Sequence, residues 1–206
     1  MRAIVMVMML RRYAGAFVAR GAVTSLRRPA QRQAVVMMSD DAVPFSRMDI
    51  RVGTFRRAWA HPDSEKLFIE EIDVGEEEPR QIVSGLQAYY SAEDLEGMRC
   101  LVVANLPKAK LAGVDSFGMV LCGSENDKAK VEILLPPDDA EIGDRVLCGD
   151  DDDAAATPNQ VKKKKIWTKV QPRLALVDGI ATCDGLPMAT PAGPCRSPTI
   201  QAGPIS

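Results

Sequence analysis

The chain has 206 residues, which is enough for one domain of ordinary size or two small ones, with a core that needs no disulfide or metal. Hydrophobic residues make up 46% of the sequence and charged residues 26%, which is the balance of a soluble globular protein. The longest candidate apolar run, residues 3–10, is far shorter than the roughly 20 residues of a membrane-spanning helix, so we expect no membrane partner.

The formal net charge of −2 is the sum of two unlike parts. Residues 1–39 contain seven arginines, no lysine and no acidic residue; the other 167 residues hold 19 of the 26 basic residues and all 28 acids, a net charge of −9. A composition rich in arginine and free of acids is typical of an organelle transit peptide. We therefore expect residues 1–39 to be a disordered transit peptide for a plastid or mitochondrion. The alternative is a disordered N-terminus on a cytoplasmic protein.

Between residues 46 and 149, short apolar runs are separated by turn signals, as is typical of a small β-barrel or sandwich. The runs at 66–74 and 80–86 flank an acidic turn and are expected to pair as a hairpin. Residues 91–94 (SAED) have the form of a capping box, which predicts a short helix. The expected strands lie at residues 50–55, 66–74, 80–86, 99–106, 117–122 and 130–135, with a final edge at 143–148.

About five principal strands, with a short helix between the third and the fourth, describe the oligonucleotide/oligosaccharide-binding (OB) barrel, although many small β domains share this pattern. We predict a mainly β fold with a five-stranded OB barrel over residues 46–149. The sheet of such a barrel fills its own interior, so a ligand is expected on an outer face or in the loops.

The composition changes after residue 149. Residues 150–153 are all aspartate, and we expect an acidic, solvated linker over 150–157. Thr157 and Pro158 suit the N-cap and first position of a helix, which we predict to run from Pro158 through Val170. The tail at 180–195 alternates apolar residues with Gly and Pro, as in short strands and turns. A small C-terminal α/β subdomain, residues 158–206, is therefore expected to pack on the barrel.

The residues that usually build metal and catalytic sites are sparse. The five cysteines are widely spaced without a C-x-x-C pair, so they predict neither a disulfide framework nor a zinc site, and most lie in apolar surroundings typical of buried thiols. The single histidine, His61, excludes sites built on several imidazoles. The sequence also has no Gly-rich phosphate loop or nucleophile elbow. We therefore expect no metal, no cofactor and no enzymatic activity.

Positive charge within the acidic body is concentrated in two places. Six basic residues and no acid lie between positions 154 and 173: Lys162, Lys163, Lys164, Lys165, Lys169 and Arg173. A solvated helical face is the usual explanation of such a run, whereas a polyanion would relieve the repulsion among the adjacent lysines. Trp167 more often anchors its helix to the core than stacks on a base. The second patch comprises Lys108 and Lys110, followed by Ser116, whose hydroxyl is able to donate to a phosphate.

Ordered sequence blocks then indicate a family. They are residues 45–53 (FSRMDIRVG), 61–67 (HPDSEKL), 69–75 (IEEIDVG), 82–86 (IVSGL), 103–106 (VANL) and 116–119 (SFGM). These blocks resemble the tRNA-binding domain that is appended to methionyl-tRNA synthetases and to synthetase-associated cofactors. Residues 158–200, with KKIW at 164–167 and CR at 195–196, resemble the C-terminal subdomain of the endothelial monocyte-activating polypeptide branch.

This resemblance implies an OB barrel with tRNA as its ligand, and a structural turn at His61. It also implies a monomer whose C-terminal subdomain packs on the barrel as a second subunit does in dimeric relatives. The implied function is non-catalytic: a cofactor that presents tRNA to an aminoacyl-tRNA synthetase. Carried over by position, the tRNA-binding residues are Ser84, Asn105, Lys108, Lys110, Ser116 and Met119, with Lys162, Lys163, Lys164, Lys165, Lys169 and Arg173 as an added electrostatic contact.

Departures from the family pattern keep another function open. Ala112 stands where family members commonly have an arginine before the glycine of a turn. Lysines often seen before the last Cys-Arg are replaced by Thr190, Pro191 and Pro194. Fewer phosphate contacts, together with general repulsion from an acidic body, weaken tRNA binding. The alternative is a protein-interaction or cytokine-like scaffold with little RNA affinity.

Overall fold

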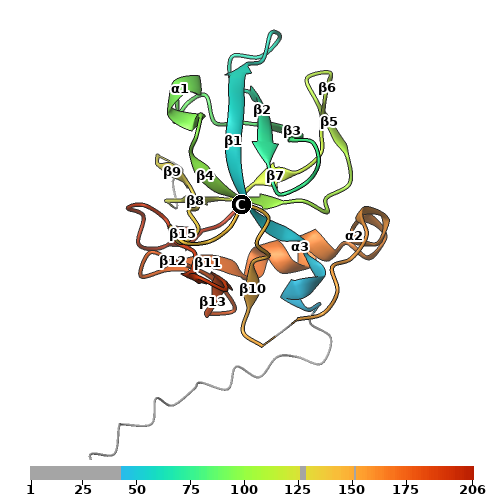
Figure 1. The fold of residues 1–206 in the computed structure, drawn as a ribbon, viewed down its shortest axis with the longest axis vertical. Helices are drawn as coiled ribbons and strands as arrows, with labels where there is room; N and C mark the ends of the chain where they lie inside the picture. The colour runs from blue at the N-terminus through green and yellow to red at the C-terminus, as the bar shows by residue number, and fades with distance from the viewer. Residues whose placement is uncertain (1–42, 126–128, 151) are drawn as a thin grey trace, which may run out of the picture. The chain divides into compact units, whose positions relative to one another are not determined.

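The structure is a computed structural model that describes residues 43–125, 129–150 and 152–206. The predicted transit peptide, residues 1–39, lies outside the described residues. The fold is mainly β, as predicted, with a nearly closed five-stranded antiparallel barrel, a second sheet and a few short helices (Figure 1). Across these described ranges, no helix combines the length and the apolar character that crossing a bilayer requires.

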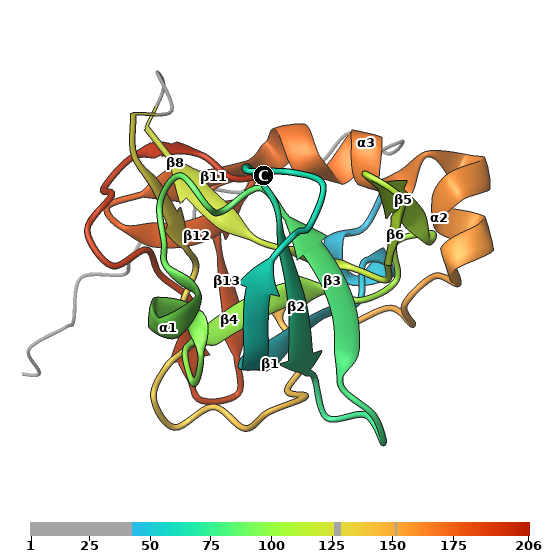
Figure 2. The same ribbon diagram turned by 90° about the horizontal axis from the view of Figure 1, so that it is seen from above.

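The barrel strands are hydrogen-bonded in the order β3-β2-β1-β4-β7, and β1, β2 and β3 lie side by side in Figure 2. Their bounds are β1 (Ile50–Ala60), β2 (Phe68–Asp73), β3 (Arg80–Ser84), β4 (Arg99–Val103) and β7 (Met119–Val120). The first half of β1 pairs with β4 and the second half with β2, with a register shift between Phe55 and Arg57. Such a bulge bends a strand and increases its twist, which allows the single long strand β1 to serve both neighbours. The predicted hairpin of β2 with β3 is confirmed.

Shorter elements follow the barrel strands. Helix α1 (Ala92–Leu95) lies between β3 and β4, and the side chains of Ser91 and Asp94 form the predicted capping box. The hairpin of β8 (Cys122–Ser124) with β9 (Val131–Ile133) falls within the region of the last two expected strands. The hairpin of β5 (Ala109–Leu111) with β6 (Val114–Ser116) was not predicted. It turns at Ala112 and Gly113, whose φ angles are 45° and 91°.

The C-terminal part begins with two helices and continues as a sheet. Thr157 and Gln160 form a capping box at the start of α2 (Pro158–Lys164), and α3 (Ile166–Val170) follows. The sheet has the order β10-β13-β12-β11-β15, and β14 pairs with β13. The remaining bounds are η1 (Phe45–Arg47), η2 (Gln171–Arg173), β10 (Leu147–Cys148), β11 (Leu174–Val177), β12 (Ile180–Cys183), β13 (Leu186–Thr190), β14 (Gly193–Pro194) and β15 (Gly203–Pro204).

The prediction of one continuous helix from Pro158 through Val170 is wrong. Lys165 adopts a left-handed conformation (φ 51°, ψ 43°) and separates α2 from α3. The reason lies in the spacing of the apolar residues, because Val161 and Ile166 are both buried but are five positions apart. In an unbroken helix the position four residues after Val161 would face the core, and that position is Lys165. The break turns the chain so that Ile166 takes the buried place and Lys165 stays exposed.

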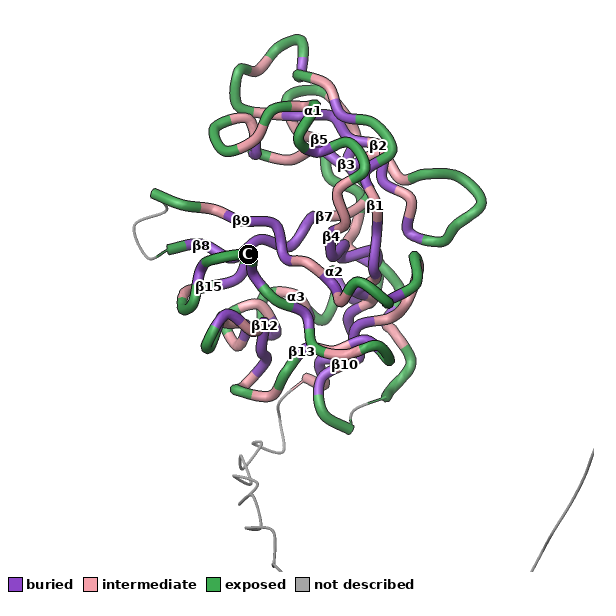
Figure 3. The backbone as a smooth tube through the Cα atoms, turned by 60° about the vertical axis from the view of Figure 1, so that its left-hand side comes forward, coloured by how far each residue is buried: buried purple, intermediate pink, exposed green. Residues whose placement is uncertain are grey.

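One hydrophobic core joins the barrel to the C-terminal part. It contains barrel residues such as Val52, Leu101 and Leu121 together with Val170 and Leu176 from beyond the linker. Buried backbone accordingly runs through β1 and β4 towards the second sheet (Figure 3). A smaller core, which includes Phe55, Phe68 and Ile82, fills the other end of the barrel. The prediction that the C-terminal subdomain packs on the barrel is therefore confirmed.

Two details at this junction differ from expectation. The segment 143–148 was expected to be a final barrel edge, and its first part does lie along β1: the Val52 N–H donates to the carbonyl oxygen of Asp144 at 2.9 Å, and the Val146 N–H donates to that of Ile50 at 2.8 Å. Only the end of the segment, β10, pairs instead with β13 of the C-terminal sheet. The linker at 150–157 is exposed at Asp152 and Asp153, whereas Ala156 is buried. The Ala156 N–H donates to the carbonyl oxygen of Arg47 at 2.9 Å. The end of the linker is therefore packed against η1 rather than solvated.

Candidate nucleic-acid interface

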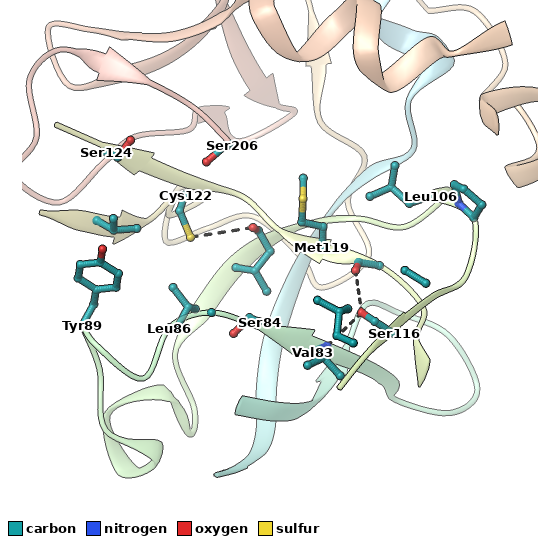
Figure 4. Close-up of a pocket in the computed structure, with 17 residues that line it drawn as sticks. Val83, Ser84, Leu86, Tyr89, Leu106, Ser116, Met119, Cys122, Ser124 and Ser206 are labelled. Atoms are coloured by element: carbon teal, nitrogen blue, oxygen red, sulfur yellow. Dashed lines mark hydrogen bonds between the residues drawn. The ribbon is translucent and has the colours of Figure 1, made fainter. Parts of the chain in front are cut away.

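A cavity of about 470 Å³ opens beside β3, β7 and the β5–β6 hairpin (Figure 4). Ser84, Ser116 and Met119, three of the residues predicted from the sequence, line it. Most of the other lining residues are apolar: Val83, Leu86, Leu106, Pro107, Ala109, Leu111, Val120 and Val131. An apolar cavity with a few hydroxyl groups is the usual form of a site for a small organic group. The sequence predicted a ligand site on an outer face of the barrel or in its loops, and this cavity lies beside both barrel strands and the β5–β6 hairpin.

Behind Ser84 lies a fully buried carboxyl group. The hydroxyl of Ser84 on β3 donates to Oε1 of Glu70 on β2, and no part of Glu70 is exposed. Burial raises the pKa of Glu70 to about 8, although the hydrogen bond from Ser84 acts in the opposite direction. Glu70 therefore carries its proton at neutral pH. Ser84 donates inward, and its oxygen remains able to accept a hydrogen bond from a group in the cavity.

Ser116 has a structural position at the cavity wall. Its side chain is buried, accepts a hydrogen bond from the N–H of Val83 at 3.0 Å and donates to the carbonyl oxygen of Gly118 at 3.1 Å (Figure 4). These bonds attach β6 to β3. Ser116 therefore holds the β5–β6 hairpin in place beside the cavity.

Asn105, predicted to contact tRNA, is also buried. Its Nδ2 donates to the carbonyl oxygens of Arg47 at 3.0 Å and Ala156 at 2.9 Å. These two acceptors belong to η1 and to the end of the linker, while Leu106, the next residue along the chain, lines the cavity. Asn105 therefore connects the cavity wall to the segment that leads into the lysine-rich helix α2.

Lys108 and Lys110, in contrast, are exposed beside the cavity. The Nζ of Lys108 lies 3.1 Å from one carboxylate oxygen of Asp115, and the Nζ of Lys110 lies 3.9 Å from the other. One carboxylate shared by two lysines leaves net positive charge on this hairpin. The Lys108 ammonium also lies over the ring of Phe117, 5.9 Å from its centroid.

Sequence reasoning missed two aromatic residues. Phe117, with 41% of its surface exposed, follows β6, and Tyr89, with 38% exposed, lines the cavity. Exposed aromatic rings are the groups on which unpaired bases stack. A large aromatic residue beside a predicted basic loop is the signal that would have found Phe117; Tyr89 gives no such signal because it is distant from that loop in the sequence.

The lysine-rich helices carry the least compensated positive charge. Lys162, Lys163, Lys164, Lys165 and Lys169 are all exposed. Within the described ranges, no carboxylate forms a salt bridge with any of them. Arg173 differs, because it donates to Asp184 and to the carbonyl oxygen of Val43, each at 2.5 Å. Trp167 is half-buried against the main core, so it anchors α3 as expected rather than offering an open ring.

His61 and the five cysteines are buried and serve the fold rather than a reactive site. His61 is buried, and its Nδ1 accepts a hydrogen bond from the N–H of Asp63 at 3.0 Å, which closes the predicted turn. All five cysteines are buried and free of disulfides. Burial raises the pKa values of Cys122 and Cys195 to about 12, so these thiols stay protonated and unreactive at neutral pH.

Comparison with known proteins agrees with the barrel fold. The family described as "Putative tRNA binding domain" matches residues 50–145, which contain the barrel strands and the β5–β6 hairpin. The C-terminal domain of p43 from Plasmodium vivax is similar over 78% of this chain and 98% of its own length, with 35% sequence identity and a TM-score of 0.71. The chain belongs to the tRNA-binding-domain family.

Relatives of the family match the barrel and the C-terminal part alike. Aminoacyl tRNA synthase complex-interacting multifunctional protein 1 of Mus musculus is 38% identical over 176 residues, which are 82% of this chain and 55% of that protein. Cytoplasmic methionine--tRNA ligase of Arabidopsis thaliana is 37% identical over 172 residues, which are 81% of this chain and 21% of that protein. The chain thus spans between about a fifth and just over half of these curated relatives.

Proposed function

We propose that this protein is a non-catalytic tRNA-binding protein that presents tRNA to an aminoacyl-tRNA synthetase. The observation that carries the proposal is the apolar cavity at Ser84 and Met119, bordered by a hairpin with two exposed lysines. Single-stranded RNA is recognised by bases that enter or stack on apolar surfaces while phosphates meet basic side chains. The cavity and the hairpin offer both kinds of contact at one place, on a member of the tRNA-binding-domain family.

The proposal assigns no chemical step to the protein. The only histidine lies in a turn. Glu70, whose pKa is raised to about 8 by burial, keeps its proton at neutral pH and so is not a base for the hydroxyl of Ser84. The C-terminal sheet, which covers the barrel with a shared core, supports a monomer in which this part replaces a second subunit.

A direct binding measurement tests the proposal. The full chain, shown to be folded by circular dichroism, should bind labelled tRNA with a dissociation constant of about 1 µM at low salt and more weakly as salt rises. Lys108→Glu, beside the cavity, should weaken binding on the order of tenfold, whereas the same change at the exposed Lys66 in the β1–β2 loop should have little effect. Absence of binding at low salt, combined with capture of a synthetase that survives nuclease digestion, would favour the scaffold alternative.

We also propose that residues 1–39 direct the protein to a plastid or mitochondrion. The seven arginines and the lack of acidic residues in this segment support the proposal. A fluorescent protein fused after residue 39 should accumulate in one of these organelles, and replacing the arginines with glutamine should leave it in the cytoplasm. Cytoplasmic fluorescence of the unaltered fusion would contradict the assignment.

A further inference from the structure

A second concave surface lies between η1 and the two lysine-rich helices. It is a groove of about 580 Å³, and Arg47, Lys164 and Lys169 line it together with Ile166 and a single carboxylate, Asp153. In Figure 1 the first described residues, in blue, lie next to α3. Three cationic side chains against one carboxylate give this groove a positive charge. Of the three, Arg47 was not among the residues predicted from the sequence.

The conformation of Lys165 explains how two of these lysines reach the same groove. In an unbroken helix, side chains five residues apart point about 140° away from one another around the axis. The left-handed residue Lys165 interrupts the helix between Lys164 and Lys169, and both side chains line the groove. Lys162 and Lys163 of α2, and Lys165 at the break, carry the same charge but do not line it. The break therefore sorts the lysines into two sets, one inside the groove and one outside.

The third cation is held in place by the backbone. Nη1 of Arg47 donates to the carbonyl oxygen of Ala154 at 2.7 Å, which fixes the guanidinium at the edge of the groove. A guanidinium has five N–H donors arranged in a plane that matches the oxygens of a phosphate. Among the described residues, no carboxylate pairs with Arg47, Lys164 or Lys169. The groove thus presents three cations that no carboxylate of the described residues neutralises.

We infer that this groove is a second RNA contact, which binds phosphates of the tRNA backbone through Arg47, Lys164 and Lys169. The inference rests on the proposed function and deepens it by separating phosphate binding here from base binding in the cavity. Asn105 joins the two places, because it bonds the carbonyl of Arg47 while its neighbour Leu106 lines the cavity. An RNA strand has both bases, which suit the apolar cavity, and phosphates, which suit the cationic groove; an acidic peptide offers only negative charge.

Two triple variants of the full chain test the inference with equal loss of charge. The first, R47Q/K164Q/K169Q, removes the three cations of the groove; the second, K66Q/K162Q/K163Q, removes three exposed cations outside it and leaves Lys165 unchanged. The groove variant should weaken tRNA binding at least tenfold and reduce the slope of log K against log salt by roughly 2. The control variant should lower affinity less than threefold. Both should keep the thermal unfolding midpoint of the unaltered protein; if the Arg47 change prevents folding, K164Q/K169Q against K162Q/K163Q gives the same comparison.

Lysine acetylation with and without bound tRNA gives an independent result. Lys164 and Lys169 should be protected by tRNA while Lys162 and Lys163 continue to react. Equal losses in the two triple variants, or equal protection of all lysines, would overturn the groove and leave only diffuse attraction. A polyglutamate peptide that protects the same pair better than tRNA at equal salt would overturn the RNA assignment. Absence of tRNA binding by the unaltered protein would instead overturn the proposed function itself.

Discussion

At the scale of single residues, the predicted tRNA contacts divide into side chains that face solvent and side chains that hold the site together. Lys108 and Lys110 are exposed, whereas Asn105 and Ser116 are buried and hydrogen-bonded to backbone groups. The polar groups of Asn105 and Ser116 form hydrogen bonds with backbone N–H and C=O groups of neighbouring segments, which need partners because they are buried. A match to a family pattern cannot tell a polar residue that contacts tRNA from one that supports the backbone, since both roles require the same side chain at the same place.

Glu70 gives a prediction about pH. Its folded pKa of about 8 lies above the ordinary value of 4.5, so its contribution to stability is complete below about 4.5 and is lost as the pH rises to about 8. At pH 7 the loss is about 3 kcal/mol, from about 1.4 kcal/mol per pKa unit. Glu70→Gln keeps an acceptor for Ser84 and removes the ionisation. The variant should therefore gain stability relative to the unaltered protein between pH 4.5 and pH 8, as measured by urea unfolding. A difference that stays constant over this range would contradict the buried, protonated carboxyl.

At the scale of elements, the sequence predicted features whose interacting groups lie within a few residues of one another. The capping box at Ser91 and the N-cap at Thr157 could be predicted because each cap joins groups three residues apart; the return bond of Gln160 at Thr157 was not predicted. The break at Lys165 could not, because it depends on where the core lies relative to α2. The β5–β6 hairpin was missed for a related reason: its strands have only three residues each, and Ser116 alone among them is buried.

Glu132 on β9 should be an important link between the barrel and the C-terminal part. Its carboxylate accepts hydrogen bonds from the side chains of Ser197 and Thr199 and from the N–H groups of Thr199 and Ile200, at 2.6 to 3.1 Å. Burial alone would raise the pKa of Glu132, but these hydrogen bonds outweigh it and lower the pKa to about 2. The ionised carboxylate therefore attaches the chain near β15 to the barrel.

Replacing Glu132 with Gln should cost about 3 kcal/mol of unfolding free energy at pH 7, since an amide cannot accept all these bonds. In the unaltered protein the same contribution is present above the ordinary pKa of 4.5 and is lost as the pH falls towards about 2. Urea unfolding at pH 7 and at pH 3 measures both effects. Glu96→Gln, at an exposed position after α1, is the matched control and should change stability by less than about 0.5 kcal/mol. Equal effects of the two substitutions would contradict the proposed link.

At the scale of the whole molecule, the barrel and the C-terminal part share one core, so we expect them to fold as one unit. Ile50, Val52, Leu121 and Leu134 of the barrel segment are fully buried in the core that the two parts share. Exposure of a buried aliphatic side chain costs about 1.5–3 kcal/mol, so four of them approach the whole net stability of a domain, about 5–15 kcal/mol. The sequence predicted a boundary between the two parts at the acidic run, because composition reveals a linker. Composition does not reveal that residues on both sides of the linker share one core.

Removal of the C-terminal part tests whether the barrel folds without it. A chain that ends at Gly149 should lose its sharp thermal transition and bind a dye for exposed apolar surface, although its strands are all present. The full chain should unfold in one cooperative step by both near- and far-ultraviolet circular dichroism. A truncated chain with the same unfolding midpoint as the full chain would show that the barrel stands alone.

The shared core also sets the order of events during synthesis. Gly123 of the barrel pairs with Ile205, and an added Cβ at Gly123 would lie 2.4 Å from Leu176, so the two parts are in close contact there. Ile205 is itself fully buried. Domains usually fold in sequence as they leave the ribosome, but this barrel reaches its final packing only after residue 205 has been made. Until then its shared-core residues lack their final cover, and we expect the growing chain to be prone to aggregation.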